Sequence, residues 1–397
     1  MEMKEKYKLE IIPISPIHIG TGDEIIYFSK NEQKIVVKDV ERFIKEEQKN
    51  AEEKYQIIKD CKADAIPQEK YALGVSFNLK AENVKRIREF NKTIDFKPYI
   101  PGTAIKAGLR TAFLSYLLND QNVSLQVKNK IIQDILPSNI SDKYADDEID
   151  KYLMGDDPQK DIFKSIQISD SKIFKIEKLK VIKIQILNVK RNSNEWMRYK
   201  IFVEAINNST DVLTETTLTI DKYLLSQNDA LLGKNKDKIN IDTLIKAAKM
   251  FSNFIINYEK KFYKNKNEVK NIYNFYNSIL TGINNNLGDN EFLLPIGWGT
   301  GWVMKTIVEI LKDHNLRNML RKRFLLGKII KNCPSCRSIL SEDKNDRTKM
   351  FCHKCKKSYT KSNVVKLIFP FPKTRKIAFI NNTTYPLGWI KIKITKL

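Results

Sequence analysis

Four of the five cysteines form two Cys-x-x-Cys pairs, and no other feature of the sequence restricts the local fold as strongly. The pairs are Cys333 with Cys336 and Cys352 with Cys355, and fifteen residues separate them. Two such knuckles place four thiolates around one Zn²⁺ ion. Because four thiolates leave no open coordination position, the spacing predicts a structural zinc ion in a zinc-ribbon insertion over residues 330–358.

The composition is that of a globular protein. The chain has 397 residues, of which 42% are hydrophobic and 29% charged, and this length predicts two or three domains, each able to bury a core. No run approaches the ~18 apolar residues that span a bilayer, and the first residues lack the apolar core of a signal peptide. We therefore expect a cytoplasmic protein that does not engage a membrane.

The chain carries a formal net charge of +23, from 70 lysines and arginines against 47 acidic residues. Such a charge is typical of proteins that bind polyanions, because each neutralised phosphate releases counterions. The chain is also rich in lysine, isoleucine and asparagine throughout, so composition alone accounts for part of the excess. The bases that lie beside glycine turns and aromatic residues therefore carry the argument.

Hydrophobic periodicity predicts an α+β protein. The expected strands and helices cover residues 7–19, 183–189, 197–206 and 389–395 for strands, and residues 101–118 and the helical region 241–283 for helices. The two middle strands form a hairpin, 183–206, with a polar tip. Hairpins interspersed with helices favour α+β over a doubly wound sheet. The polar stretch after residue 231 predicts a boundary between an N-terminal domain, 1–231, and a C-terminal domain, 232–397.

A glycine turn feeds the helix expected from residue 101. Thr103 lies at its N-terminus, where free backbone N–H groups and the helix dipole attract phosphate. Lys106 and Arg110 follow at i and i+4, so both side chains can reach the same phosphate backbone. The alternative is an ordinary capped helix with two exposed bases.

A second glycine-rich loop covers residues 297–302. Gly297, Gly299 and Gly301 give a backbone that can approach a ligand closely. Trp298 and Trp302 offer stacking faces for bases or, alternatively, a hydrophobic anchor for the loop. The chain lacks both G-x-x-x-x-G-K-[ST] and a strand-linked G-x-G-x-x-G, so the use of ATP or of a dinucleotide has no support.

The hairpin 183–206 combines bases with aromatic residues. Arg191 and Arg198 lie near Trp196 and Tyr199. Bases that pair with phosphates beside aromatic rings that stack suit single-stranded nucleic acid. A merely solvated hairpin is the alternative.

Five segments are ordered along the chain in a recognisable way: PIHIGTGDE at 16–24, YIPGTAIKAGLR at 99–110, DIFKSIQISDS at 161–171, LPIGWGTGW at 294–302, and FPKTRKIAF with PLGWIKI near the end. Together they resemble the RAMP superfamily of CRISPR-associated proteins. Within it, the chain is similar to the family of fifth subunits of type III-A Csm effector complexes. The cysteine knuckles would be an insertion relative to a minimal member.

The resemblance implies two ferredoxin-like (RRM-like) domains and a non-catalytic subunit that binds guide RNA (crRNA). Such a subunit caps the complex near the 3′ end of the crRNA and supports crRNA maturation in antiviral defence. Its partners would be crRNA and the other Csm subunits, above all the backbone RAMP subunit. Target RNA joins them if the hairpin 183–206 enters the guide–target duplex. No small-molecule substrate is expected.

The same resemblance, with the motifs above, predicts the residues along the RNA path. They are His18, Gly20, Thr21, Gly22, Thr103, Lys106, Arg110, Arg191, Arg198, Gly297, Trp298, Gly299, Thr300, Gly301, Trp302 and Lys305.

Two other functions stay open at this point. An endoribonuclease needs a general base and acid, and His18 is the histidine beside a glycine turn. Metal-dependent cleavage would make Asp23 the candidate, although an Asp next to a turn is more often a turn or cap residue. A zinc-ribbon DNA-binding protein is the third possibility, but no helix-turn-helix or C2H2 pattern supports it. The acidic segment 142–161 reads as a solvated face or as a docking surface for a basic neighbour, and Cys61 reads as a free thiol.

Overall fold

The structure is a computed structural model, and it describes residues 3–46, 50–141, 147–189, 194–227, 232–233, 235–307, 312–327, 329–369 and 371–397. Arg191 and residues 228–231, next to the expected domain boundary, lie outside the described residues.

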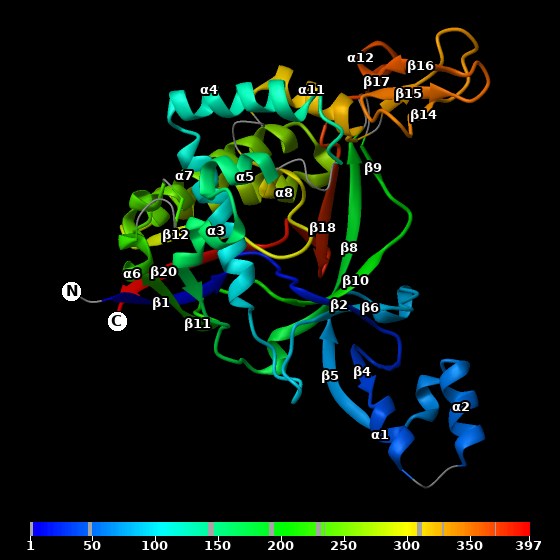
Figure 1. Cartoon of the computed structure of the whole chain (residues 1–397). Coiled ribbons are helices and arrows are strands. Elements are labelled where there is room, and N and C mark those ends of the chain that lie inside the picture. Colours follow the sequence, from blue (N-terminus) through cyan, green and yellow to red (C-terminus); the bar gives the residue numbers. More distant parts are fainter. Residues whose placement is uncertain are drawn as a thin grey trace.

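The first of two large sheets has its strands in the order β12-β20-β1-β11-β7 (Figure 1). Their bounds are Glu291–Pro295, Trp389–Lys396, Lys4–Pro13, Thr214–Asp221 and Ile166–Ile168, in that order. All neighbouring strands are antiparallel. The N-terminal strand β1 therefore lies at the centre, between the C-terminal strand β20 and β11.

Two helices, α3 (Gly102–Leu117) and α7 (Ile241–Tyr263), pack against each other and against this sheet. In chain order, the strands and helices of this layer are β1, α3, β7, β11, α7 and β20, and the elements of the second sheet are inserted between them. This is the β-α-β-β-α-β arrangement of a ferredoxin-like unit, with β12 added at the edge beside β20. The expected α+β class is confirmed, as are the helix at 101–118 and the C-terminal strand.

The expected helical region 241–283 is interrupted. Helix α7 begins at its cap Asn240, whose side chain accepts a hydrogen bond from the Thr243 N–H at 2.8 Å. It ends because Lys264 is extended and Asn265 adopts a left-handed φ of 65°. Shorter helical pieces then continue as α8 (Lys270–Asn274), a π-helical turn (Phe275–Leu280) and α9 (Thr281–Asn285).

The second sheet curls around the long strand β8 (Leu179–Val189). Its other strands are β2 (Gly20–Ile25), β3 (Phe28–Asn31), β4 (Lys34–Lys38), β5 (Glu69–Val75), β6 (Ile87–Phe90), β9 (Asn194–Trp196), β10 (Ile201–Ile206), β18 (Thr374–Ile380) and β19 (Thr383–Tyr385). The first part of β8 pairs with β10 and the second with β9, both antiparallel. The predicted hairpin 183–206 is thus confirmed, except for its tip, which is not described.

Each of the two large sheets contains strands from both sides of residue 231. In the first, β20 pairs with β1 over Tyr7–Pro13, and in the second, β18 pairs with β8. The division into an N-terminal domain, 1–231, and a C-terminal domain, 232–397, stays a prediction, and strands of both parts pair with each other in the two large sheets.

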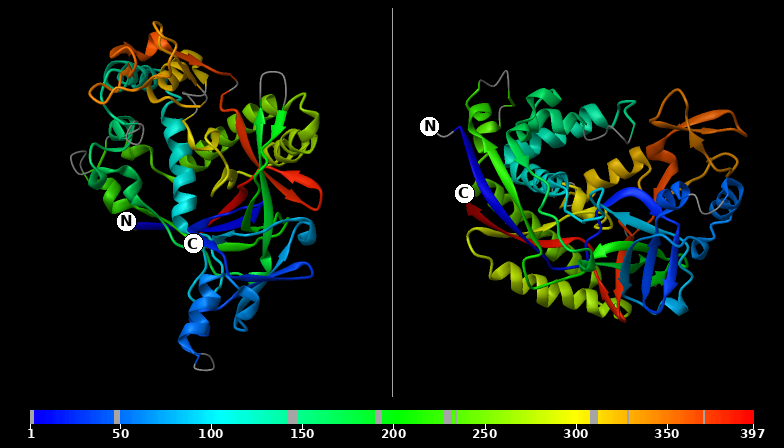
Figure 2. Two further views of the ribbon diagram at one scale, coloured as in Figure 1. Left: turned by 90° about the vertical axis from the view of Figure 1, so that its right-hand side faces the viewer. Right: turned by 90° about the horizontal axis from the view of Figure 1, so that it is seen from below.

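A segment rich in cysteine lies at one end of the molecule and the helices α1 (Val40–Lys45) and α2 (Ala51–Lys59) at the other, as Figure 1 and the left view of Figure 2 show. We call residues 329–367 the cysteine segment. It contains β13 (Ile329–Lys331), β14 (Ser341–Glu342), β15 (Lys349–Cys352), β16 (Lys357–Thr360), α12 (Lys361–Val364) and β17 (Val365–Leu367). Helices α4 (Gln121–Lys130) and α11 (His314–Phe324) lie at the same end of the molecule, beside the cysteine segment in Figure 1.

The remaining helices are α5 (Asp147–Met154) and α6 (Lys222–Ser226). Helix α5 covers part of the acidic segment 142–161, whose residues 142–146 are not described. None of the helices in the described part of the chain is long and apolar enough to cross a membrane.

Candidate metal centre and candidate nucleic-acid interface

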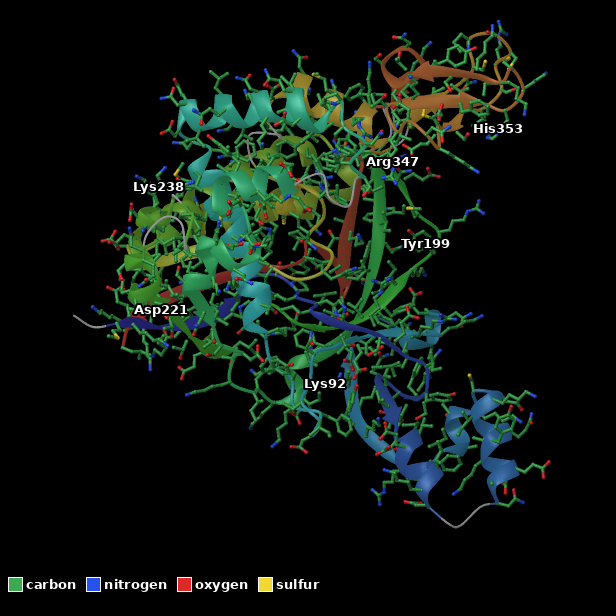
Figure 3. The ribbon with its side chains drawn as sticks, viewed as in Figure 1. Lys92, Tyr199, Asp221, Lys238, Arg347 and His353 are labelled. Atoms are coloured by element: carbon green, nitrogen blue, oxygen red, sulfur yellow. The ribbon has the colours of Figure 1, made fainter. Side chains whose placement is uncertain are left out.

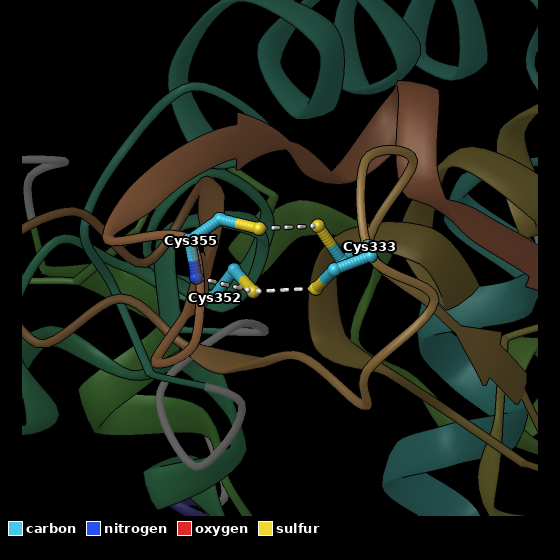
Figure 4. Close-up of side chains that lie close together, drawn as sticks. Cys333, Cys352 and Cys355 are labelled. Atoms are coloured by element: carbon cyan, nitrogen blue, oxygen red, sulfur yellow. Dashed lines mark hydrogen bonds between the residues drawn. The ribbon is translucent and has the colours of Figure 1, made fainter.

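The four predicted cysteine ligands converge on one point. Their sulfur atoms all lie within 4.8 Å of one another, and Figure 4 shows Cys333, Cys352 and Cys355 turned toward a common centre. The Sγ atoms of Cys333 and Cys355 are 3.8 Å apart, and those of Cys336 and Cys352 are 3.6 Å apart. A tetrahedron with Zn–S bonds of ~2.3 Å has edges of about 3.8 Å, whereas a disulfide needs about 2 Å. The cluster therefore fits a tetrahedral metal ion better than a disulfide.

The two knuckles share one backbone conformation. Arg337 donates its N–H to the Cys333 carbonyl at 2.9 Å, and Lys356 donates to the Cys352 carbonyl at 2.8 Å. Arg337 and Lys356 each follow the second cysteine of a knuckle, and each has a left-handed φ, 61° and 54°. Each turn thus folds its two thiols to the same side. This matched geometry gives the sequence pattern its structural meaning.

The cysteine segment is fastened to the rest of the chain by Arg323, at the end of α11. Its buried guanidinium donates to the carbonyl oxygens of Leu136 at 3.1 Å and Ile140 at 3.0 Å. Lys361 returns from the cysteine segment and donates to the Arg323 carbonyl at 2.9 Å. These bonds fix the orientation of the cysteine segment relative to α4. Arg347 lies at this junction, and its N–H donates to the Asn139 side chain at 3.2 Å, whereas the exposed His353 lies on the outside of the segment (Figure 3).

The glycine-rich loop 297–302 docks on the segment that follows β1. The Trp298 N–H donates to the His18 carbonyl at 2.8 Å, and the two residues form an isolated β-bridge. The His18 ring also meets the Trp298 ring edge-on, with centroids 5.6 Å apart. Two of the predicted RNA-path elements, far apart in the sequence, are thus brought together.

Glycine at position 297 is required by this contact. A Cβ there would lie 2.5 Å from the His18 carbonyl oxygen, and the residue has φ of 80°. Gly301 also has a positive φ, 90°, but a Cβ there would meet open space. The loop therefore uses Gly297 for a close approach and Gly301 only for its turn.

Two cations lie over the Trp298 ring, and a third, Lys305, lies near one of them, Lys376. The guanidinium of Arg88 lies 4.6 Å from the centroid of the Trp298 ring, and the Lys376 ammonium lies 5.1 Å from it. Burial lowers the pKa of Lys376, and the nearby charges of Lys305 and Arg88 lower it further. We call Arg88, Lys305 and Lys376 the cation cluster. Because three cations lie close together, the surface around Trp298 is locally positive, and an anion would stabilise it.

Both tryptophans of the loop act as partly exposed anchors. Trp298 packs against the small buried cluster that includes Leu387, and Trp302 lies 5.1 Å from the Phe371 ring. Thr300 is buried and donates its hydroxyl to the Gly297 carbonyl at 3.3 Å. Trp298 and Trp302 thus anchor the loop by hydrophobic packing, which is the alternative to base stacking that the sequence left open.

The N-terminus of α3 is already capped within the chain. The Gly102 N–H donates to the Asp170 carboxylate at 2.9 Å. Lys106 donates to the Ile166 carbonyl at 2.7 Å, and burial lowers its pKa. Thr103 is exposed. The Gly102 N–H and the Lys106 ammonium, which lie at the expected phosphate site, thus already have partners within the chain.

Arg110 is held by two carboxylates. It bonds Asp161 at 2.7 Å and Asp150 at 2.9 Å. The acidic segment is thus, in part, a docking surface for a base of its own chain.

The turn Gly20-Thr21-Gly22 is exposed, and Thr21 accepts the Asp23 N–H at 3.1 Å, so Asp23 takes part in a local turn.

The hairpin presents part of its predicted surface. Arg198 and Tyr199 are exposed, and Tyr199 lies on its outer side (Figure 3). Trp196 instead packs edge-on against Phe379, with centroids 5.1 Å apart. Lys200 pairs with Glu82 at 2.6 Å. Arg198 and Tyr199 are therefore the predicted contacts that remain available on the described part of the hairpin.

His18 is buried, with 2% of its surface exposed, and its Nδ1–H donates to the Glu204 carbonyl at 2.7 Å. Burial lowers its pKa to about 4, and the charges of Arg88 and Lys92 act in the same direction. The imidazole is therefore neutral at pH 7 and enclosed, which does not suit a general base that must reach an RNA hydroxyl.

Sequence reasoning missed two members of the cation cluster. Lys376 lies in the recognised segment FPKTRKIAF, so its placement there was a usable signal. Arg88 gave no local signal, because β6 reaches the cluster through parallel pairing with β10. Sequence reasoning also missed Glu204, whose fully buried carboxylate pairs with Lys92 and accepts the Phe90 N–H.

Comparisons with known proteins agree with this architecture. The sequence model of the RAMP superfamily matches residues 10–304. The CRISPR system Cms protein Csm5 of Methanocaldococcus jannaschii is 27% identical over 330 residues, which cover 81% of this chain and 67% of that protein. The Csm5 protein of Streptococcus thermophilus is 24% identical over 250 residues, covering 54% of this chain and 65% of that protein. The matches thus span about two thirds of each relative.

Two solved structures share the fold. A chain in the cryo-EM structure of a Csm-crRNA-target RNA ternary complex of a type III-A CRISPR-Cas system has a TM-score of 0.68 and 21% identity, over 98% of this chain and 100% of that one. The crystal structure of T. onnurineus Csm5 has a TM-score of 0.59 and 21% identity, over 96% of this chain and 99% of that one.

Proposed function

The chain belongs to the RAMP superfamily, and on that premise we propose that it is a non-catalytic crRNA-binding subunit of a type III-A Csm interference complex. It caps the complex near the 3′ end of the crRNA and supports crRNA maturation. The Csm5 relatives of two organisms and the shared fold support the placement in such a complex. Its partners are crRNA and the other Csm subunits, above all the backbone RAMP subunit.

The observation that carries RNA binding is the docking of the glycine-rich loop on His18 beside the cation cluster. Arg88, Lys305 and Lys376 together supply positive charge next to a loop backbone that faces open space at Gly301. Phosphate contacts of this kind give affinity without sequence preference.

The hairpin extends the proposed RNA path. Arg198 and Tyr199 offer an exposed base and an exposed ring on one strand connection. These groups suit single-stranded RNA or a guide–target duplex. The 3′-capping role and the entry of the hairpin into a duplex both rest on the family resemblance.

The absence of a proposed catalytic role rests on the placement of the candidate residues. His18 is enclosed and neutral, and Asp23 takes part in a turn. Among the described residues, the cysteine quartet is the one group of three or more His, Cys, Asp or Glu side chains close enough to hold a metal ion. We propose that the quartet holds one structural Zn²⁺ ion, and that this ion stabilises the cysteine segment.

Reconstitution with guide RNA tests the proposal. The full chain is mixed with labelled single-stranded RNA, with and without Mg²⁺ and with and without its partner subunits, and duplex DNA of equal length serves as the comparison. Salt-sensitive RNA binding without cleavage, and incorporation into the complex, are expected. Cleavage by the purified chain would replace the proposal with an endoribonuclease, and a preference for duplex DNA would favour a DNA-binding protein.

A further inference from the structure

A cavity of about 480 Å³ opens beside the glycine-rich loop, enclosed by α3, α5, α11 and residues 302–307. One part of its wall is apolar and includes Leu114, Ile149 and Phe324. Another part carries Lys305, Arg317 and Arg321. The cavity therefore offers an apolar body and a cationic end, which is the pattern that an amphipathic anion needs.

Arg321 is the most informative residue of the cavity. Only 1% of its surface is exposed, yet its Nη1 atom is buried without a hydrogen-bond partner among the described residues. Its Nη2 atom donates to the Ile368 carbonyl at 2.8 Å, and the rings of Phe369 and Phe371 lie 4.8 and 4.2 Å from its guanidinium carbon. A buried guanidinium donor left unpaired is costly, and an anion in the cavity would satisfy it.

The charges around Arg321 point the same way. Burial lowers its pKa, and the positive charge of Arg317, one helical turn away, lowers it further. Asp150 also lines the cavity, but its carboxylate is 2.9 Å from Arg110 on the α3 side. The cationic end thus carries surplus positive charge within the described residues.

We propose that this cavity binds one nucleotide, with its phosphate at Arg321 and Lys305 and its base against the apolar wall. A volume of about 480 Å³ is larger than a lone phosphate requires and falls in the range of small-ligand sites. Lys305 belongs both to the cation cluster and to the cavity, so an RNA strand on the glycine-rich loop passes its mouth. The choice of a nucleotide rests on the proposed function. Its source is either one nucleotide of the bound RNA or a free mononucleotide.

Calorimetry on the full chain measures the free ligand first. The probes are adenosine 5′-monophosphate, adenosine and inorganic phosphate. We expect the monophosphate to bind at least about tenfold more tightly than either of the others, because each of them supplies only half of the required contacts.

Two variants test the cavity without touching Arg321, whose replacement risks unfolding. Thr111→Phe fills the cavity from the partly exposed face of α3, and Lys305→Met removes a charge at its rim. Lys322→Met removes the same charge from α11 outside the cavity and serves as the control. Melting temperatures confirm that each variant folds. Thr111→Phe and Lys305→Met are expected to weaken nucleotide binding about tenfold, and Lys322→Met to leave it unchanged.

RNA affinity of the same variants separates the two sources. If Thr111→Phe weakens RNA about tenfold and the monophosphate competes with RNA, the ligand is a nucleotide of the strand. If only monophosphate binding falls, the ligand is a free mononucleotide.

Two further outcomes decide between the proposals. The cavity assignment is overturned, while the RNA-binding role stands, if the wild-type chain shows no saturable monophosphate binding and Thr111→Phe leaves RNA binding intact. The RNA-binding role is overturned, while the cavity assignment stands, if the chain binds the monophosphate but binds no RNA, either alone or in the assembled complex.

Discussion

The carbonyl oxygen of His18 accepts the N–H of Trp298 at 2.8 Å, and this bond joins the end of the first strand to a loop from the last quarter of the chain. The bond holds the glycine-rich loop against His18 and Ile19 and places Trp298 beside Arg88 on β6. The positive surface proposed for RNA therefore depends on a backbone contact that only glycine at position 297 permits.

Alanine at the two loop glycines is expected to have unequal effects. Gly297→Ala combines a positive φ with a Cβ 2.5 Å from the His18 carbonyl oxygen, so it should displace the loop and cost about 3 kcal/mol. Gly301→Ala meets open space and should cost only about 1 kcal/mol of backbone strain. Urea unfolding and RNA affinity are measured for both. Equal losses would mean that the His18 contact does not hold the loop.

The buried imidazole predicts a loss of stability in acid. Its pKa is about 4 in the folded chain against an ordinary value of 6.5, because burial disfavours the charged form. Between these two pH values the unfolded chain binds more protons, so stability falls as the pH falls through this window, by about 3 kcal/mol in total. His18→Gln, which cannot titrate, should flatten this part of the curve. An unchanged pH profile of urea unfolding would show that His18 is not the titrating group.

The cysteine quartet predicts one zinc ion per chain. Cys352→Ser removes a fully buried ligand and should bring bound zinc close to zero, and the cysteine segment should become sensitive to proteases, since a metal bound only to the folded state stabilises it. Cys61→Ser is the matched control, because Cys61 is an exposed free thiol. Metal analysis and limited proteolysis are the readouts. Full zinc content in Cys352→Ser would exclude the four-thiolate site.

One buried ion pair should contribute far more to the stability of the fold than any exposed ion pair. Arg375 on β18 meets Glu259 on α7 through two bonds, 2.9 and 2.7 Å, and both side chains are buried. Arg375→Met leaves an uncompensated carboxylate and should cost about 3–5 kcal/mol. The double variant with Glu259→Met should recover much of this loss. If single and double variants are equally destabilised in urea, the pair is not coupled.

Local sequence signals predicted the local structure well. The 3.6-residue period and the cap Asn240 specify α7, and the spacing of the knuckles specifies two matching turns. Alternation of apolar and polar residues likewise predicted the hairpin around β8, apart from its undescribed tip.

Long-range pairing could not be predicted in the same way. Nothing local shows that the C-terminal strand β20 pairs with β1, because the choice among antiparallel partners depends on the whole sheet. For the same reason Lys106 and Arg110 resembled free phosphate ligands, although the Ile166 carbonyl and the acids Asp150 and Asp161 engage them in the fold.

The salt dependence of RNA affinity tests the central claim most directly. The double variant Arg88→Met/Lys376→Met removes two cations from the Trp298 surface, and Arg86→Met, whose exposed side chain pairs with Glu24 at 3.2 Å, is the control. In the assembled complex the double variant should bind crRNA more weakly and lower the log–log salt slope by about two, while the control keeps the wild-type slope. A double variant with wild-type affinity and slope would contradict the assignment of this surface to RNA.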